Sequence, residues 1–301
     1  MSEKKSFKSG FVSLIGRPNV GKSTLVNALV GEKVSIMSDK PQTTRNRITA
    51  IYTDEEMQLI FLDTPGVQKP RNKLGEFMLK ASSDSMKETD IILLVVDDSK
   101  EIGRGDREIL ENLRNIRSIR MLAVNKIDRI TKEELAQIVR MYDEEKIFDE
   151  IIPVSALKGT NHERLRKVLA SRLSEGPQYF PEDMRTDQPE KVLIAEIVRE
   201  KLLLYTDKEV PHGIAVEIET MKVRERKEIF DISAVIYCER ESHKKIIIGR
   251  EGRKLKGVGK SAREELEHIF GMKINLQLWV KVKENWRDRE NYIRSFGFRE
   301  E

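Results

Sequence analysis

The feature that most constrains the fold is the pattern Gly-x-x-x-x-Gly-Lys-Ser at residues 16–23. It follows residues 11–15, an apolar run suited to a short buried strand. A helical spacing of apolar side chains comes next, at Leu25, Val26, Leu29 and Val30. The order strand, glycine loop, helix is typical of a loop whose backbone N–H groups converge on phosphates. The alternative interpretation is a glycine-containing turn that caps a core helix.

This loop predicts which residues contact a nucleotide. The Lys22 ammonium can neutralise the outer phosphates, and the Ser23 hydroxyl can hold Mg²⁺. The expected nucleotide contacts in this segment are Gly16, Arg17, Pro18, Asn19, Val20, Gly21, Lys22, Ser23 and Thr24.

Three more motifs each follow an apolar strand. They are Asp63-Thr64-Pro65-Gly66, Asn125-Lys126-Ile127-Asp128 and Ser155-Ala156-Leu157. Ligands of open α/β sheets collect beyond the carboxyl ends of the strands, so all four motifs can face one pocket. Residues 47–63 instead predict two adjoining strands around a turn. We therefore expect an α/β domain with a mostly parallel sheet and one antiparallel edge pair.

The third and fourth motifs indicate which base is bound. Guanine presents two donors, N1 and N2, beside the acceptor O6. The Asp128 carboxylate can accept from both donors, and a backbone N–H near Ala156 can donate to O6. Adenine has the opposite polarity and would leave Asp128 unpaired, which is a strong discrimination. The expected ligands are therefore GTP and GDP, with Asp63 serving Mg²⁺ through water.

The four motifs resemble those of the translation-factor class of GTPases. Residues 125–128 match N-K-x-D, and residues 63–66 match D-x-x-G. Residues 41–45, Pro-Gln-Thr-Thr-Arg, resemble the switch threonine motif of the Era subgroup. The resemblance implies that Thr44 reaches Mg²⁺ and the γ-phosphate, with Thr43 as the alternative. By composition alone, this segment is also typical of a solvated turn.

The residues predict slow hydrolysis. Positioning and charge neutralisation carry phosphoryl transfer, and the groups expected to supply them are Lys22, Thr44, the Gly66 N–H and Asn19. Val67 follows Gly66, where many GTPases have a glutamine that orients the attacking water. Stimulation is therefore expected from a partner or an ion.

Two sources of positive charge are candidates for that stimulation. Asn19 resembles the asparagine of GTPases in which K⁺ supplies the charge of an arginine finger. Arg45 and Arg47 are rival cations, although arginines of a mobile loop are more often solvated.

Bulk properties limit the remaining possibilities. The 301 residues predict two domains. No segment reaches the roughly 20 apolar residues that span a bilayer. The single cysteine, Cys238, excludes an internal disulfide, and the histidines show no metal-ligand spacing. The net charge of +4 is modest, so any nucleic-acid site must be local.

Composition changes near residue 180. We expect a GTP-binding domain at 1–175, a Pro- and Gly-containing linker at 176–188, a second domain at 189–285 and a C-terminal tail at 286–301. The second domain reads as helix, two strands, helix, G-x-x-G, helix, strand. This order resembles a bacterial-type (type II) KH domain with an α+β fold, which implies binding of single-stranded RNA.

The G-x-x-G sequence is Gly249-Arg250-Glu251-Gly252. Its glycines would let an RNA backbone approach closely, and the flanking isoleucines could form an apolar floor for unpaired bases. The expected RNA contacts are Ile246, Ile247, Ile248, Gly249, Arg250, Glu251, Gly252, Arg253, Lys254 and Lys256. Glu251 departs from the usual neutral or basic residue. Taken alone, G-x-x-G also suits a glycine turn that joins two helices.

Over essentially its whole length the sequence resembles the Era family of ribosome-assembly GTPases, including residues 276–283, Leu-Gln-Leu-Trp-Val-Lys-Val-Lys. The resemblance implies binding near the 3′ end of 16S ribosomal RNA and a role in 16S rRNA processing and biogenesis of the 30S subunit. It also implies a cytoplasmic location with peripheral association at the membrane. Nothing in the sequence demands more than a monomer. The alternatives are a GTP-dependent signalling or cell-cycle switch whose second domain binds a protein, and a GTPase that binds the membrane surface through its basic patch.

Overall fold

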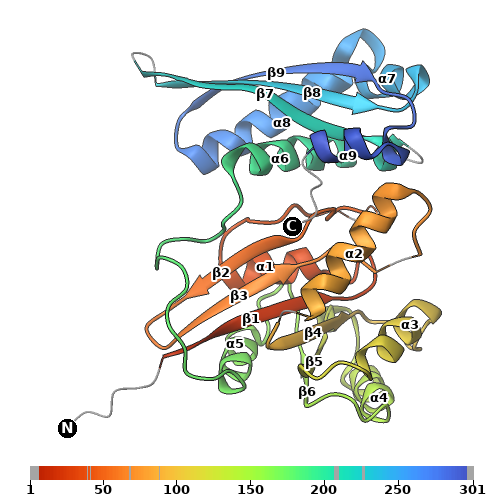
Figure 1. The fold of residues 1–301 in the computed structure, drawn as a ribbon, viewed down its shortest axis with the longest axis vertical. Helices are drawn as coiled ribbons and strands as arrows, with labels where there is room; N and C mark the ends of the chain where they lie inside the picture. The colour runs from red at the N-terminus through yellow and green to blue at the C-terminus, as the bar shows by residue number, and fades with distance from the viewer. Residues whose placement is uncertain are drawn as a thin grey trace. The chain divides into compact units, whose positions relative to one another are not determined.

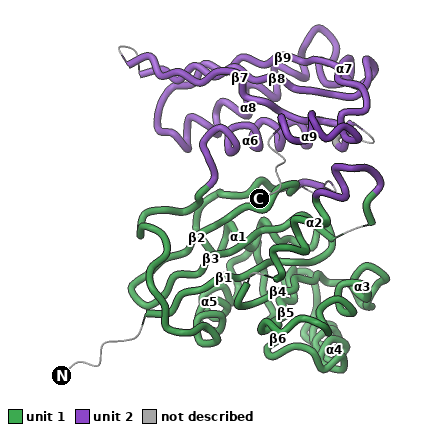
Figure 2. The backbone as a smooth tube through the Cα atoms, viewed as in Figure 1, with its two compact units in different colours: residues 1–37, 44–70, 78–187 green, residues 38–43, 71–77, 188–301 purple. Residues whose placement is uncertain are grey.

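The computed structural model describes residues 7–38, 40, 42–67, 69–87, 89–206, 210–225 and 228–296. Pro41 of the threonine motif lies outside these residues. The chain forms two compact units (Figure 2). The first comprises residues 1–37, 44–70 and 78–187, and the second comprises residues 38–43, 71–77 and 188–301.

The first unit is built on a six-stranded sheet in the order β2-β3-β1-β4-β5-β6 (Figure 1). The strands are β1 Lys8–Ile15, β2 Ile48–Thr53, β3 Met57–Asp63, β4 Ile91–Val96, β5 Ile119–Val124 and β6 Glu150–Pro153. All neighbours are parallel except β2 and β3. The β2–β3 turn forms because the Asp54 carboxylate accepts the N–H groups of Glu56 and Met57. The expected sheet with one antiparallel edge pair is confirmed.

Helices cover both faces of this sheet. They are α1 Lys22–Val30, α2 Lys73–Lys87, α3 Arg104–Leu113, α4 Lys132–Asp143 and α5 His162–Ser171, with a short 3₁₀ turn, η1 Ile127–Arg129. Apolar residues of α1 and α5 pack on one face, and those of α3 and α4 on the other. Helix α2 was not predicted from the sequence. Among the described residues, no helix is long and apolar enough to cross a membrane.

The predicted linker is hydrogen-bonded to the sheet of the first unit. The Gln58 side chain of β3 accepts the N–H groups of Tyr179 and Phe180 and donates to the Phe180 carbonyl. The Thr186 hydroxyl donates to the Thr49 carbonyl of β2 at 2.7 Å. Low periodicity in this segment therefore reflects an irregular strap on the sheet edge.

The second unit has a three-stranded sheet in the order β7-β8-β9, with β7 and β8 antiparallel and β8 and β9 parallel. Its elements are α6 Glu190–Tyr205, η2 Val210–Gly213, β7 Ala215–Arg224, β8 Ile229–Cys238, α7 Glu241–Ile248, η4 Arg250–Gly252, α8 Arg253–Phe270 and β9 Lys273–Val282. Helices α6 and α8 lie on one face of this sheet (Figure 1), and their apolar residues share its core. The predicted α+β order is confirmed.

The segment expected to be a C-terminal tail from residue 286 begins in the core of the second unit. It contains η5 Trp286–Asp288 and α9 Glu290–Ser295. The Trp286 side chain is fully buried, and its indole N–H donates to the Gly213 carbonyl at 2.9 Å. A single large apolar residue in a polar segment carries no periodicity, so the sequence did not reveal this packing.

Candidate functional site

The four motifs of the first unit lie at one edge of its sheet. Strands β1, β3, β5 and β6 run in the same direction, and each motif begins at the carboxyl end of one of them or within two residues after it. The predicted convergence therefore follows from the parallel strand order.

Two glycines of the phosphate loop have conformations that other residues rarely adopt. Gly16 has a φ of 150°, and Gly21, at the N-cap of α1, has a φ of 97°. A Cβ on Gly16 would lie 2.4 Å from the Val95 carbonyl oxygen, and one on Gly21 would lie 2.3 Å from the Asn125 amide nitrogen. Both glycines are therefore required by close packing as well as by backbone conformation.

The Lys22 ammonium is held inside this loop. Its side chain is buried, and Nζ donates to the carbonyl oxygens of Gly16 at 3.1 Å and Arg17 at 3.0 Å. Burial lowers the pKa of Lys22 to about 8, although the nearby Asp63 charge opposes the shift. A desolvated cation whose acceptors, among the residues that the structure describes, are two neutral carbonyls is well placed to pair with an incoming phosphate.

Three oxygen-bearing side chains form a candidate Mg²⁺ site. The hydroxyls of Ser23 and Thr44 lie 2.9 Å apart. Asp63 is fully buried, and within the described part of the chain neither of its carboxylate oxygens accepts a hydrogen bond. Burial raises the pKa of Asp63, and the Lys22 charge and neighbouring hydroxyls only partly offset this. A buried carboxylate whose charge is only partly compensated, beside two hydroxyls, fits a hard divalent cation, because Mg²⁺ prefers oxygen ligands.

The two candidate threonines point to different partners. The Thr44 hydroxyl faces Ser23, as described above, whereas the Thr43 hydroxyl donates to the Lys40 carbonyl at 2.6 Å within its own loop. This geometry favours Thr44 as the metal-facing residue. Arg45 is only 1% exposed, so the expectation that it is a solvated side chain is wrong.

The Asp-Thr-Pro-Gly motif packs directly on the phosphate loop. The Val67 N–H donates to the Gly16 carbonyl at 3.1 Å. A Cβ on Gly66 would lie 2.8 Å from the Pro18 nitrogen, so glycine permits this approach. The Thr64 hydroxyl, by contrast, is fully buried and donates to the Leu14 carbonyl at 2.6 Å. Its side chain therefore joins β3 to β1 and does not face the pocket.

Asn125 connects the guanine-recognition motifs to the phosphate loop. It is 2% exposed; its amide donates to the Val20 carbonyl at 2.9 Å, and its oxygen accepts the Ala156 N–H at 2.9 Å. Since the Ala156 N–H is already paired, the next amide along the loop, that of Leu157, is the candidate donor to guanine O6.

Asp128 is exposed and available to a base. The Ser155 hydroxyl donates to its carboxylate and lowers its pKa. The acceptor is therefore ionised at neutral pH and oriented by the neighbouring motif, which is the arrangement that guanine N1 and N2 require.

Another acidic residue at this edge, Asp97, directly follows β4 and belongs to none of the predicted motifs. Its carboxylate accepts hydrogen bonds from Arg17 at 3.2 Å and from Lys126 at 3.4 Å. Lys126 also donates to the Asn19 carbonyl at 2.8 Å. Its position in the sequence could have revealed it, because Asp97 follows a buried strand that ends at the same edge as the motifs.

The G-x-x-G segment lies in the second unit, between α7 and α8. Gly249 and Gly252 have φ values of 71° and 72°, and Glu251 between them has a φ of 55°. Arg250, Arg253 and Lys256 are exposed around the turn, and Arg253 pairs with the Glu251 carboxylate at 2.7 Å. Glu251 is thus partly neutralised.

The isoleucines before this turn do not form a continuous surface. Ile246 is 43% exposed, but Ile247 is fully buried in the core of the second unit. The expectation that Ile247 contacts RNA is therefore wrong, because consecutive residues of α7 point in different directions.

Comparisons with known proteins agree with this geometry. The family model for the 50S ribosome-binding GTPases matches residues 11–126, and the KH-domain model matches residues 209–287. GTPase Era of Clostridioides difficile is 65% identical over 293 residues, which are 97% of this chain and 99% of the relative. The chain belongs to the Era GTPase family. GTPase Era of Alkaliphilus metalliredigens is 56% identical over the same shares of the two chains.

A solved Era structure also matches the whole fold. Era in complex with MgGDPNP and nucleotides 1506–1542 of 16S ribosomal RNA has a TM-score of 0.93 and 43% identity, covering 97% of this chain and 99% of that one. This Era-family chain is therefore a GTPase with a C-terminal KH domain.

Proposed function

We propose that this GTPase binds 16S ribosomal RNA near its 3′ end through the KH domain and acts in 16S rRNA processing and biogenesis of the 30S subunit. The observation that carries the proposal is the exposed turn at Gly249–Gly252, with its positive φ angles and surrounding basic side chains. The Era complex that contains nucleotides 1506–1542 supports it. A cytoplasmic location with peripheral association at the membrane belongs to the same proposal.

The nucleotide site works through positioning and charge. The phosphate-loop amides and Lys22 hold the phosphates, while Asp128 and the neighbouring amide read guanine. Ser23, Thr44 and Asp63 would hold Mg²⁺, which neutralises charge on the phosphate oxygens. The Gly66 N–H would contact the γ-phosphate. Val67 offers no polar side chain, so backbone groups orient the attacking water and intrinsic turnover is slow.

The RNA-binding turn is tested with a matched pair of glycine substitutions. Gly252→Asp should lose RNA affinity at least about tenfold, because a carboxylate would meet the phosphate backbone. Gly271→Asp is the control, since Gly271 also has a left-handed φ and both sites leave open space for a Cβ. RNA retention by filter binding and GDP affinity should be measured together.

The two variants separate the candidate functions. We expect Gly252→Asp to lose RNA binding with GDP binding intact, and Gly271→Asp to keep both. Unchanged RNA retention by Gly252→Asp and by Gly249→Asp would refute the RNA-binding proposal and favour the protein-binding switch. A loss confined to anionic liposomes would favour the membrane-surface alternative.

The identity of the switch threonine is tested by Thr44→Ala and Thr43→Ala. We expect Thr44→Ala to weaken Mg²⁺-dependent binding of a GTP analogue far more than GDP binding, because its hydroxyl faces Ser23. Thr43→Ala should leave both affinities within about threefold, since it removes hydrogen bonds to Ser38 and Lys40 of its own loop. The reverse pattern would assign the role to Thr43.

We also infer that K⁺ assists hydrolysis beside Asn19. Replacing K⁺ with Na⁺ at equal ionic strength should slow turnover. Asn19 has a φ of 67°, so Asn19→Gly removes the side chain without backbone strain and should abolish the difference between the two salts. Equal wild-type rates in K⁺ and Na⁺ would exclude the ion.

A further inference from the structure

Asp97 lies where two functional loops can be reached at once. Strand β4 sits between β1 and β5 in the sheet, and β1 leads into the phosphate loop while β5 leads into Asn125-Lys126-Ile127-Asp128. Asp97 directly follows β4. No recognised motif follows this strand, yet the loops on either side of Asp97 are the phosphate loop and the base-recognition loop.

The Asp97 carboxylate bridges one cation from each loop. Oδ1 accepts from Arg17 at 3.2 Å, and Oδ2 accepts from Lys126 at 3.4 Å. The Ser99 hydroxyl also donates to Oδ1, at 2.6 Å, which orients the carboxylate. Burial raises the pKa of Asp97, but Ser99 and the two cations outweigh it and hold the pKa below its usual range.

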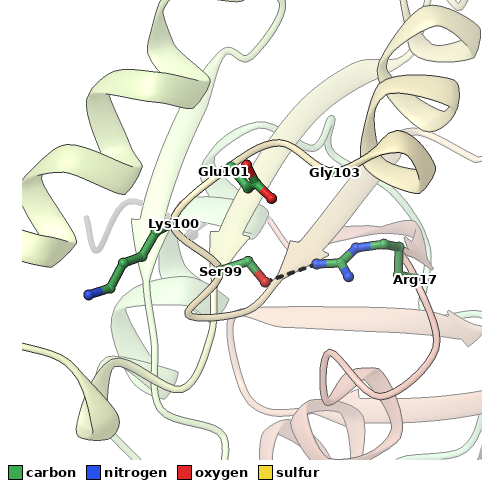
Figure 3. Close-up of a pocket in the computed structure, with 5 residues that line it drawn as sticks. All are labelled: Arg17, Ser99, Lys100, Glu101 and Gly103. Atoms are coloured by element: carbon green, nitrogen blue, oxygen red, sulfur yellow. Dashed lines mark hydrogen bonds between the residues drawn. The ribbon is translucent and has the colours of Figure 1, made fainter.

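Arg17 is fixed from its other side. Its Nε pairs at 2.8 Å with Asp106, whose side chain is fully buried at the start of α3. Gly105 leaves room for this arrangement, because a Cβ there would lie 3.1 Å from the Arg17 side chain. The guanidinium therefore contacts Asp97, Ser99 and Asp106. Arg17 also lines a pocket of about 440 Å³ together with Ser99 and Gly103 (Figure 3).

Lys126 connects Asp97 to the phosphate loop. Its backbone has a φ of 64°, and its ammonium donates to the Asn19 carbonyl of the phosphate loop at 2.8 Å. Of the described residues, the ammonium thus contacts one neutral acceptor, the Asn19 carbonyl, and one anion, Asp97. Without the anion, Lys126 would keep only the neutral contact, and the spacing between the two loops would be less well defined.

We propose that Asp97 is a positioning residue for guanine-nucleotide binding: it ties Lys126 to Arg17 and so holds the base-recognition loop against the phosphate loop. The proposal rests on nucleotide binding at these motifs, which titration of the unsubstituted protein tests separately. The Asp97 carboxylate contacts Lys126, Arg17 and Ser99, so its effect on the nucleotide must pass through these side chains.

The first test is Asp97→Asn, with Asp143→Asn as the matched control. Asp143 makes an exposed ion pair with Lys146, so it undergoes the same change of charge away from the motifs. We expect Asp97→Asn to weaken GDP binding about five- to tenfold through faster dissociation, since Lys126 and Asp97 are only partly exposed. The kcat at saturating GTP should stay within about twofold. Asp143→Asn should change neither.

A double-mutant cycle distinguishes positioning from general structural support. In a Lys126→Met background, Asp97→Asn should cost much less GDP affinity than in the unsubstituted protein, because its acceptor role is already lost. Asp97→Glu, which keeps the charge, should restore most of the affinity. Fully additive losses, an unchanged affinity in Asp97→Asn, or an equal fall of kcat and kcat/KM would each overturn the proposal.

Discussion

Gly21 offers the sharpest test of how the phosphate loop and the guanine-recognition motif are coupled. The residue is the N-cap of α1, with a φ of 97°, and a Cβ there would lie 2.3 Å from the Asn125 amide nitrogen. Asn125 is nearly fully buried and uses that same nitrogen to bind the Val20 carbonyl. Gly21→Ala must therefore displace a buried side chain that already has its hydrogen bonds satisfied.

The expected cost has two parts. Left-handed backbone costs an L-residue about 1–2 kcal/mol relative to glycine. Displacing Asn125 leaves a buried amide and the Val20 carbonyl unpaired, which costs about 1–3 kcal/mol more. We expect Gly21→Ala to lower the free energy of unfolding of the first unit by about 2–5 kcal/mol.

A substitution of Gly31, at the other end of α1, measures the cost of the left-handed backbone by itself. Gly31 has a φ of 87°, and a Cβ built on it would meet no other described residue within 4 Å beyond its own helix and chain neighbours. Gly31→Ala should therefore cost only the conformational part, about 1–2 kcal/mol. It should also leave GDP affinity unchanged, whereas Gly21→Ala should weaken GDP binding because Asn125 moves.

The measurement is urea unfolding of the nucleotide-free protein followed by far-UV circular dichroism. Trp279 and Trp286 both lie in the second unit, so tryptophan fluorescence would not report on the first. Fluorescent GDP titration gives the affinity of each variant. If Gly21→Ala and Gly31→Ala lose equal stability and both keep GDP affinity, the contact between Gly21 and Asn125 has no energetic role and the reasoning fails.

Three further outcomes follow from buried groups. Asp63→Asn should raise the free energy of unfolding of the Mg²⁺-free protein at pH 7 by about 1–3 kcal/mol: burial raises the pKa of Asp63 in the folded state, so its negative charge destabilises the folded state at any pH above its pKa in the unfolded chain. Urea unfolding of the variant should show no gain in stability from added Mg²⁺. GDP binding should take up a proton above pH 8 and weaken as pH rises, since the pKa of Lys22 is about 8 and a bound phosphate raises that pKa. Calorimetry in two buffers of different ionisation enthalpy measures the proton uptake, and Lys22→Met should abolish the uptake. Trp286→Ala should cost the second unit about 3–5 kcal/mol, whereas Trp279→Ala, at a side chain 57% exposed, should cost under about 1 kcal/mol by denaturant unfolding.

The motifs and the fold class could be predicted from the sequence because both depend on the order of residues within short segments. Each motif follows a short apolar strand, and parallel strands bring their carboxyl ends to one edge whatever the loop lengths between them. The same locality explains the antiparallel edge pair, whose turn is made by Asp54 within a few residues of both strands. The order of elements in the KH domain was predicted for the same reason.

Other features were decided only when distant segments met. Asp97 is an ordinary acidic residue in the sequence and becomes a bridge only because β4 lies between β1 and β5. Trp286 and the strap at 176–187 carry little periodicity, and their places depend on long-range hydrogen bonds to Gly213 and Gln58. Ile247 looked like a surface residue until the direction of α7 was known.

The sequence by itself determined that this chain binds guanine nucleotides, because the residues that recognise the phosphates and the base lie in short contiguous motifs. The tertiary structure alone decided which hydroxyl faces Ser23, which two cations Asp97 holds and which isoleucine is buried. The reason is geometric: a motif specifies the chemistry of its own few residues, whereas the direction of a side chain depends on neighbours that lie far away along the chain.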